Sequence, residues 1–187
     1  LMSRSTHSFA TPQPSSAITA NPTPGVATSA QKPIRVTIVQ PALAKYRIPV
    51  FRELAHRPGI DLRVVYGSVK DLENVDAEGF EAIPTHRWQP SLFGQGLVFN
   101  RADWTYATRR LSDVIIFQWT PRSLSLVPSM LRARADGVPR ILWGHGYAKD
   151  EKSRRRGARK WLTRFASVLL FYEPTTREAY ILDGWNP

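Results

Sequence analysis

The sequence predicts an α/β protein built on a doubly wound parallel sheet, and three observations predict it. Five short runs rich in apolar and β-branched residues alternate with segments that have helical spacing. The runs are nearly continuous in apolar residues, as strands covered by helices on both faces are. The β-α-β order favours right-handed crossovers, which place each strand beside a parallel neighbour. We therefore expect one central sheet with helices on both faces.

The predicted strands are bounded by glycine, proline and polar residues that begin loops. They occupy residues 34–40, 60–67, 113–118, 141–143 and 167–172. Helices are expected at 49–55, 101–111, 124–135, 153–165 and 174–183. The buried stripe of the first helix is expected to consist of Val50, Phe51, Leu54 and Ala55. Between 68 and 100 the periodicity is weak, and the short extended pieces 80–84 and 86–88 have no assigned partner strands.

Composition divides the chain into a tail and one domain. Residues 1–33 contain six Ser, five Thr, five Pro and no acidic residue, so they bury too little apolar surface and are predicted to be a disordered tail. Residues 34–187 carry enough aliphatic and aromatic side chains for one ordinary domain. Cysteine is absent, which excludes disulfides and thiolate chemistry. No apolar run approaches the roughly 18 residues that span a bilayer, and the expected location is cytoplasmic.

Positive charge is concentrated in one stretch of the sequence. The chain has a formal net charge of +11, and residues 140–164 contain nine of its Lys and Arg against two acids. At helical spacing, one face of the predicted helix is apolar and consists of Ala158, Trp161, Leu162 and Phe165. The other faces carry the cations of a candidate anion-binding patch, which are Arg154, Arg155, Arg156, Arg159, Lys160 and Arg164.

Three interpretations of this basic helix stay open. It is an ordinary surface helix with solvated charges, a face that docks on anionic lipid, or a contact for nucleic acid. Each cation near an anionic membrane contributes about 1 kcal/mol, so docking is energetically adequate. Nucleic acid is the least favoured partner, because no stacking platform or recognisable binding motif accompanies the charges.

Candidate ligand-binding residues follow the predicted strands, because open α/β sheets bind ligands where strand carboxyl ends meet helix N-termini. His145 lies in such a loop, where an imidazole can hydrogen-bond a sugar hydroxyl or a phosphate oxygen. Arg47 in the first loop can hold a phosphate or carboxylate in a forked pair. The candidate substrate-binding set is Lys45, Tyr46, Arg47, Gln118, Arg122, Gly144 and Gly146. The alternative for these residues is structural: turn geometry for the glycines, packing for the aromatic residue and solvation for the cations.

Several common motifs are absent from the sequence. No GxGxxG follows the first strand, and no GxxxxGK precedes a Ser or Thr, so neither a dinucleotide fingerprint nor a P-loop is present. GxSxG and HExxH are absent as well, and no metal site is predicted.

Five segments occur in a familiar order: IRVTIVQP, KYRIPVFREL, DVIIFQWTPRS, ILWGHGY and ASVLLFYEPTTREAYILDGWNP. In this order and spacing, residues 34–187 resemble the N-terminal Rossmann-like domain of family 4 glycosyltransferases, which have the GT-B fold. The resemblance implies a retaining transfer of a sugar from a nucleotide-diphosphate sugar to an acceptor hydroxyl. It also implies that this domain shapes the acceptor side of the cleft. His145 matches the histidine of the family's His-Gly element, which lies close to the transferred sugar, and is the implied catalytic residue.

The resemblance further implies contact with a membrane. Many members act on lipid-linked acceptors and dock through a basic amphipathic helix, to which residues 153–165 are similar. Peripheral attachment to the inner face of the membrane is therefore the second part of the expected location. No cofactor is expected, because the nucleotide-sugar is a co-substrate that the family's other domain mainly binds.

Two features depart from the family pattern. Many members have a glycine pair in the first loop, where this chain has Ala42-Leu43-Ala44, which puts phosphate contact there in doubt. The second domain, with the nucleotide site and an E-x7-E element, does not follow residue 187, so we expect the N-terminal half of an enzyme that is inactive alone. The alternative function is a non-catalytic basic module that binds anionic membrane or nucleic acid.

Overall fold

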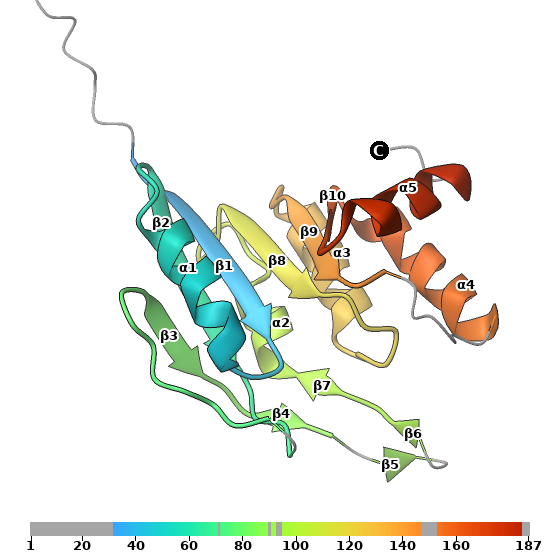
Figure 1. Cartoon of the computed structure of the whole chain (residues 1–187), viewed down its shortest axis with the longest axis horizontal. Helices are drawn as coiled ribbons and strands as arrows, with labels where there is room; N and C mark the ends of the chain where they lie inside the picture. Colours follow the sequence, from blue (N-terminus) through green and yellow to red (C-terminus); the bar gives the residue numbers. More distant parts are fainter. Residues whose placement is uncertain (1–31, 71, 90, 93–94, 147–152, 185–187) are drawn as a thin grey trace, which may run out of the picture. The chain divides into compact units, whose positions relative to one another are not determined.

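The central feature of the computed structural model is a six-stranded parallel sheet, which Figure 1 shows with its flanking helices. The structure describes residues 32–70, 72–89, 91–92, 95–146 and 153–184. Nearly all of the predicted tail 1–33 lies outside these residues. The strands are β1 (Ile34–Gln40), β2 (Ile60–Tyr66), β3 (Glu81–Pro84), β8 (Val114–Gln118), β9 (Arg140–Gly144) and β10 (Val168–Phe171).

The strand order is β10-β9-β8-β1-β2-β3, and each neighbouring pair is parallel. The chain moves outward from β1 to β2 and β3, then returns to the other side of β1 and continues through β8, β9 and β10. The direction therefore reverses between β1 and β8. The α/β class and all five predicted strands are confirmed, and β3, within the segment of weak periodicity, is the strand without a predicted partner.

Four helices lie close to their expected ranges, whereas the helix expected at 101–111 ends at Tyr106. The helices are α1 (Ile48–Ala55), α2 (Arg101–Tyr106), α3 (Leu126–Ala135), α4 (Ser153–Leu162) and α5 (Pro174–Leu182), with short 3-10 turns η1 (Lys45–Arg47) and η2 (Thr163–Phe165). Pro49 lies in the first turn of α1, where its missing N–H leaves no backbone bond unmade. Gly137 follows α3 with a φ of +67°, a conformation in which a Cβ would be strained.

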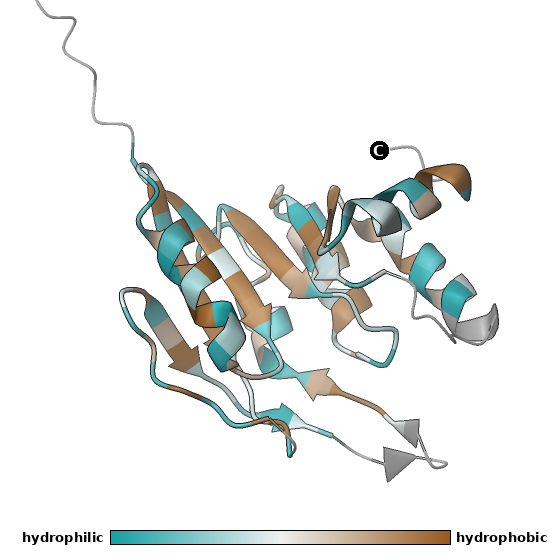
Figure 2. Ribbon diagram, in the orientation of Figure 1, coloured by the Kyte–Doolittle hydropathy of each residue, from teal (hydrophilic) through white to brown (hydrophobic). Residues whose placement is uncertain are grey.

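Apolar residues alternate along the strands and form one core on each face of the sheet. On one face, Ile38 and Ile116 pack with Phe51 of α1. On the other, Ile115 and Phe117 pack with residues of α2, α3, α4 and α5. Figure 2 shows the largely apolar strands next to helices of mixed hydropathy. Both faces of the sheet are covered, as the continuous apolar runs predict.

The excursion between β3 and α2 contains two small antiparallel pairs. β4 (Arg87–Trp88) pairs with β7 (Phe99–Asn100), and β5 (Ser91–Leu92) pairs with β6 (Gln95–Gly96). In the first pair Arg87 is opposite Asn100, and Trp88 is opposite Phe99. Because side chains alternate between faces, Trp88 and Phe99 are exposed, whereas the other two residues face the body of the domain.

Two side chains expected in buried stripes are exposed. Val50 is 53% exposed because Ile48 and Phe51, three positions apart, define the buried face of α1 and Val50 lies about 100° from it. Trp161 is 47% exposed because its neighbour Leu162 faces the core. Among the described residues, no helix is both long and apolar enough to cross a membrane.

Candidate functional site

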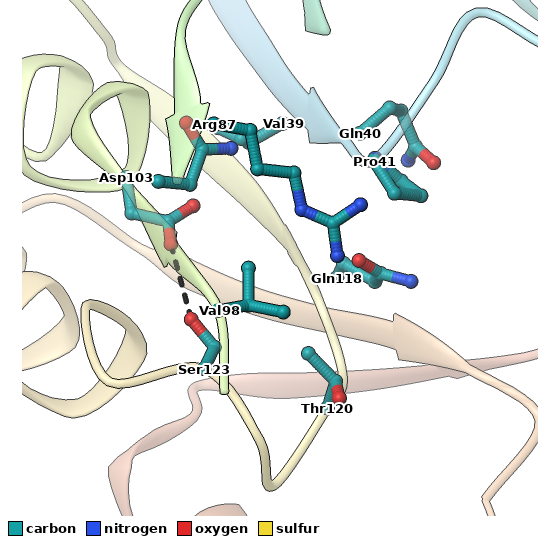
Figure 3. A pocket seen from close by; sticks show the side chains of 10 residues that line it. Val39, Gln40, Pro41, Arg87, Val98, Asp103, Gln118, Thr120 and Ser123 are labelled. Atoms are coloured by element: carbon teal, nitrogen blue, oxygen red, sulfur yellow. Dashed lines mark hydrogen bonds between the residues drawn. The ribbon is translucent and has the colours of Figure 1, made fainter. Parts of the chain in front are cut away.

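The carboxyl ends of β1 and β8 form a crevice where the strand order reverses. Ile38 pairs with Ile116, so Gln40 and Gln118 end the two strands at the same level. Loops that leave neighbouring strands in opposite directions open a space at such a point, where α/β sheets bind ligands. The space has an empty volume of about 270 Å³. This switch-point crevice, shown in Figure 3, is lined by Val39, Gln40, Pro41, Arg87, Val98, Asn100, Asp103, Gln118, Thr120 and Ser123.

Arg87 carries its positive charge into the crevice from β4. Its stem passes over Gly67, where a Cβ would lie 3.0 Å from the Arg87 Cβ and 3.1 Å from the Pro41 carbonyl oxygen. Its Nη1 is buried and has no hydrogen-bond partner within the described part of the chain. Desolvation by burial lowers the pKa of the guanidinium, although the charge of Asp103 opposes this.

Asp103 supplies a buried carboxylate on the wall of the crevice. Ser125 Oγ donates a hydrogen bond of 2.6 Å to its Oδ2, and Ser123 Oγ donates a longer one of 3.4 Å. Figure 3 shows this carboxylate turned toward Ser123, while the Arg87 side chain extends toward Gln118. Burial raises the pKa of Asp103 to about 6, and the bonds from the serines and the charge of Arg87 limit the rise.

Gln40 provides a buried amide at the end of β1. The residue is only 1% exposed, and its Oε1 has no hydrogen-bond donor among the described residues. A buried amide oxygen without a donor is uncommon in folded proteins. Sequence reasoning selected Gln118 and missed Gln40, although both are polar residues that end buried strands.

A second cluster, which we call the aromatic rim, lies at the ends of β9 and β10 and in the η1 turn. Arg47 Nη2 donates to the Tyr172 hydroxyl at 2.7 Å, and Arg47 Nε donates to the Tyr46 hydroxyl at 3.1 Å. The same guanidinium lies 5.0 Å from the centroid of the Trp143 ring. His145 is exposed and stacks on Tyr172 with ring centroids 4.2 Å apart. Burial raises the pKa of Tyr172, with Arg47 acting against the shift.

The structure brings together some of the predicted ligand-binding residues. Arg47 bonds both Tyr46 and the Tyr172 hydroxyl, and His145 stacks on the Tyr172 ring, so three predicted residues lie in one cluster. Gln118 instead lines the switch-point crevice. Lys45 is exposed in the η1 turn. Arg122 is exposed, and its carbonyl oxygen accepts a backbone hydrogen bond of 2.9 Å from Val98. The prediction that these residues bind substrate remains a prediction.

Both predicted glycines are held in close contacts. A Cβ on Gly144 would lie 2.9 Å from the Trp119 Cβ, so the absence of a side chain lets Trp119 pack into the core. Gly146 has a φ of +65°, and a Cβ there would lie 2.5 Å from Thr176 Cγ2 of α5. These contacts give each glycine a packing role in addition to any role at the site.

The cations of α4 contact the rest of the domain at several points. Arg156 and Lys160 both donate to Asp183, which ends α5, and Arg159 Nη1 donates to the Trp119 carbonyl oxygen at 3.1 Å. Arg164 is exposed. The side chains of Arg154 and Arg155 lie outside the described part of the structure. Three members of the predicted anion-binding patch therefore also bind groups of the protein itself.

The carboxyl edge of the sheet thus offers two kinds of contact for a ligand. The switch-point crevice has a half-buried cation and an amide oxygen that lacks a donor among the described residues, and the aromatic rim has rings next to an arginine and an imidazole. Within the described residues there is no cluster of three His, Asp or Glu side chains that could hold a metal ion. The first β-α loop is filled by the buried side chains of Ala42, Leu43 and Ala44.

No protein-family model matches the chain, and no curated protein matches it in sequence. Solved structures do match its fold. One is a Listeria monocytogenes protein assigned as a UDP-N-acetylglucosamine 2-epimerase, with a TM-score of 0.52 and 13% identity over 83% of this chain. Another is the UDP-GlcNAc 2-epimerase of Methanocaldococcus jannaschii, with a TM-score of 0.46 and 12% identity over 81% of this chain.

The domain has a Rossmann-like α/β fold. At 13% identity the likeness extends to the fold alone. The chain spans 43% of the length of each of these two structures, so it corresponds to less than one half of either protein. Because the two parts of the site lie at the carboxyl edge of this fold, they occupy the position where such sheets bind ligands.

Proposed function

We propose that this domain takes part in a reaction of a nucleotide-diphosphate sugar, and that the reaction is transfer of the sugar to an acceptor hydroxyl. The observation that carries the proposal is the switch-point crevice at the carboxyl edge of the Rossmann-like sheet, in which Arg87 Nη1 and Gln40 Oε1 are buried without hydrogen-bond partners among the described residues. The order of the sequence segments, which resembles family 4 glycosyltransferases, supports the retaining type of transfer.

In this proposal the domain forms the acceptor side of a cleft. The buried Ala42-Leu43-Ala44 loop leaves little backbone free to approach a diphosphate, which supports a donor held mainly by another domain. His145 is exposed at the end of β9 and is the proposed group that contacts the transferred sugar. Its stacking on Tyr172 restricts the orientation of the imidazole. No cofactor or metal is part of the proposal.

Epimerisation of the nucleotide-sugar is the second candidate reaction. It is favoured by the activity named for the Listeria protein whose fold matches. The two reactions differ in their products: transfer releases a nucleoside diphosphate and places the sugar on an acceptor, whereas epimerisation returns a nucleotide-sugar of altered configuration.

The test is an assay of the chain within its complete reading frame against a panel of labelled nucleotide-diphosphate sugars. Sugar on an acceptor together with free nucleoside diphosphate is the expected result, and an epimerised nucleotide-sugar would replace transfer by the second candidate. H145A is expected to lower turnover about tenfold or more, which corresponds to about 1.4 kcal/mol of lost binding in the transition state. H56A is the matched control, because it also removes an imidazole but lies at the C-terminal end of α1, away from the loops that follow the strands. Failure to consume any nucleotide-sugar would refute both candidates.

Docking on an anionic membrane is a further proposal, for the helix α4. Trp161 is 47% exposed beside the exposed Arg164, a combination that suits the interface of a bilayer. R164E is expected to weaken sedimentation with vesicles containing anionic lipid, while vesicles of neutral lipid bind neither protein. Equal binding of R164E and the unmodified chain, or equal binding to oligonucleotides, would exclude this role.

A further inference from the structure

We propose that the switch-point crevice binds an oxyanion, so that the acceptor carries a carboxylate or phosphate group that Arg87 and the amide of Gln40 recognise. The inference rests on the proposed function and extends it, because it names the class of acceptor as an acidic or phosphorylated sugar rather than a neutral one. It is carried by the positions and bonding of three side chains.

The first observation is a half-buried cation whose Nη1 is buried and has no partner among the described residues. No carboxylate of the described residues lies within salt-bridge distance of Arg87, and its buried Nη1 donates no hydrogen bond there. Burying a charge without a partner is unfavourable, and structures normally offset it with a salt bridge or hydrogen bonds. A planar guanidinium fits the two oxygens of a carboxylate or phosphate in a forked pair. An oxyanion in the crevice would supply the missing partner.

The second observation is that Asp103 does not fill this role, although it lines the same crevice. Its Oδ2 accepts the 2.6 Å bond from Ser125 Oγ. The same Ser125 Oγ accepts a bond of 3.0 Å from the backbone N–H of Asn100. This network holds the carboxylate on the α2 side of the crevice. Figure 3 shows the guanidinium of Arg87 extended toward Gln118 instead. The arginine is therefore directed at the open part of the crevice.

The third observation is the amide oxygen of Gln40. Unlike Arg87, it needs a donor, and the residue is 1% exposed. A sugar acid or sugar phosphate presents hydroxyl donors next to its anionic group, so one ligand satisfies both orphaned atoms.

The competing interpretation is that solvent occupies the crevice and that Arg87 only supports the fold. It predicts no difference between anionic and neutral sugars. Both interpretations require the Arg87 side chain to enter the crevice, and the absence of a side chain on Gly67 leaves room for its stem. Binding measurements decide between them.

The test uses the full chain, labelled with 15N, titrated with glucuronate, glucose 6-phosphate and glucose, and with inorganic phosphate as the minimal probe. We expect saturable shifts of the Val98, Asn100 and Thr120 amide signals with the two anionic sugars, and at least tenfold weaker binding of glucose. Glucuronate and glucose 6-phosphate distinguish a carboxylate from a phosphate source. Equal affinity for glucose, or no saturable shift with any anion, would overturn the proposal.

Three variants connect the binding to the named residues. R87M is expected to abolish the shifts, and R87K, which keeps the charge but loses the fork, to weaken binding several-fold. R101M, which removes an exposed cation next to Asn100, should bind as the unmodified chain does. If R87M fails to fold, R87K against R101M still tests the assignment, since a purely electrostatic surface effect would weaken R101M and leave R87K unchanged.

Q40M gives a readout that is independent of charge. Replacing an orphaned buried amide with an apolar side chain of similar length should raise the urea midpoint and weaken anionic sugars at the same time. A raised midpoint with unchanged sugar binding would refute the role of Gln40 in recognition. The outcome is separable from the proposed function: turnover of a nucleotide-sugar without oxyanion binding refutes only the inference, and oxyanion binding without turnover refutes only the function.

Discussion

An arginine and an aspartate lie at each end of the β1–β8 strand pair. They form a salt bridge at the amino end and none at the carboxyl end. At the amino end, Arg35 Nε and its backbone N–H each donate to Asp113 Oδ2 at 3.0 Å, and Arg35 Nη2 donates to Oδ1 at 3.1 Å. At the carboxyl end, Arg87 and Asp103 line one crevice without forming a salt bridge. The more buried pair is thus the less satisfied one.

The pKa values of the two aspartates record this difference. The hydrogen bonds from Arg35 hold the pKa of Asp113 well below its usual range, whereas burial raises the pKa of Asp103 to about 6. A group bonded in its charged form stabilises the fold, and a group desolvated in its charged form destabilises it. The charged form of Asp113 at the amino end therefore stabilises the fold, whereas the charged form of Asp103 at the carboxyl end destabilises it.

The largest change in the free energy of unfolding is expected for a variant of Asp103, at the carboxyl end of the strand pair. D103N removes the buried charge but keeps an oxygen that can accept the bond from Ser125. With a folded-state pKa of about 6 and an unfolded value of about 3.8, the charge lowers the free energy of unfolding by about 3 kcal/mol at pH 7.5. We expect D103N to be more stable than the unmodified chain by up to that amount in urea titrations.

The sign of this effect fixes its pH window. Because the folded-state pKa is raised, the stability contributed by protonated Asp103 is present below about pH 4 and lost as the pH rises toward 6. The advantage of D103N should therefore shrink from pH 7.5 to pH 4.5 and vanish below pH 4. A loss of stability in D103N at pH 7.5 would mean that the carboxylate is needed to balance Arg87, and that the two ends are alike.

A second substitution, at the end of β9, tests whether the carboxyl edge of the sheet is loosely packed outside the switch-point crevice. On β9, Gly144 lies so close to Trp119 that an added Cβ would approach its Cβ to 2.9 Å. Overpacking of this kind typically costs about 1–3 kcal/mol, so G144A should lower the free energy of unfolding by that amount. G157A in α4 is the matched control, because nothing lies within 4 Å of the added Cβ.

In a helix interior, alanine is favoured over glycine by about 1 kcal/mol, so G157A should raise the stability. Chemical denaturation of both variants measures the contrast. If G144A were as stable as the unmodified chain, the end of β9 would have spare room, and the switch-point crevice would be one part of a wider opening along the edge of the sheet.

The sheet could be predicted from the sequence because its strands carry their own signal. IRVTIVQ and VIIFQ are rich in apolar and β-branched residues, as strands covered on both faces are. β3 has four half-buried or exposed residues ending in proline, and it lies at the sheet edge, so its local pattern is weak. The central strands can be recognised from their own apolar residues, whereas β3 is recognised only from its hydrogen-bonded pairing with β2.

Three members of the aromatic rim, Tyr46, Arg47 and His145, lie in loops that follow predicted strands, so the sequence predicts that they face the same edge of the sheet. The crevice could not be predicted, because Arg87 and Asp103 come from the excursion and from α2, and only tertiary folding carries them to the end of β1. Arg87 reaches its position by passing over Gly67, twenty residues earlier in the chain. Gln40 did carry a signal, as a polar residue that ends a buried strand in register with Gln118.

The smallest expected effect tests the amino end of the comparison. D113N removes the charge that Arg35 neutralises but leaves one amide oxygen to accept its bonds, and the two side chains are 28% and 22% exposed, so solvent and salt weaken the attraction. At pH 7 we expect a modest decrease in the urea midpoint. Because the folded-state pKa of Asp113 is depressed, its stabilising contribution is present above the unfolded value of about 3.8 and lost as the pH falls further. The midpoints of D113N and the unmodified chain should therefore converge in strong acid, opposite in sign to D103N. If the two variants instead responded to pH in the same direction, the distinction between a bonded and a desolvated aspartate at the two ends of one strand pair would be wrong.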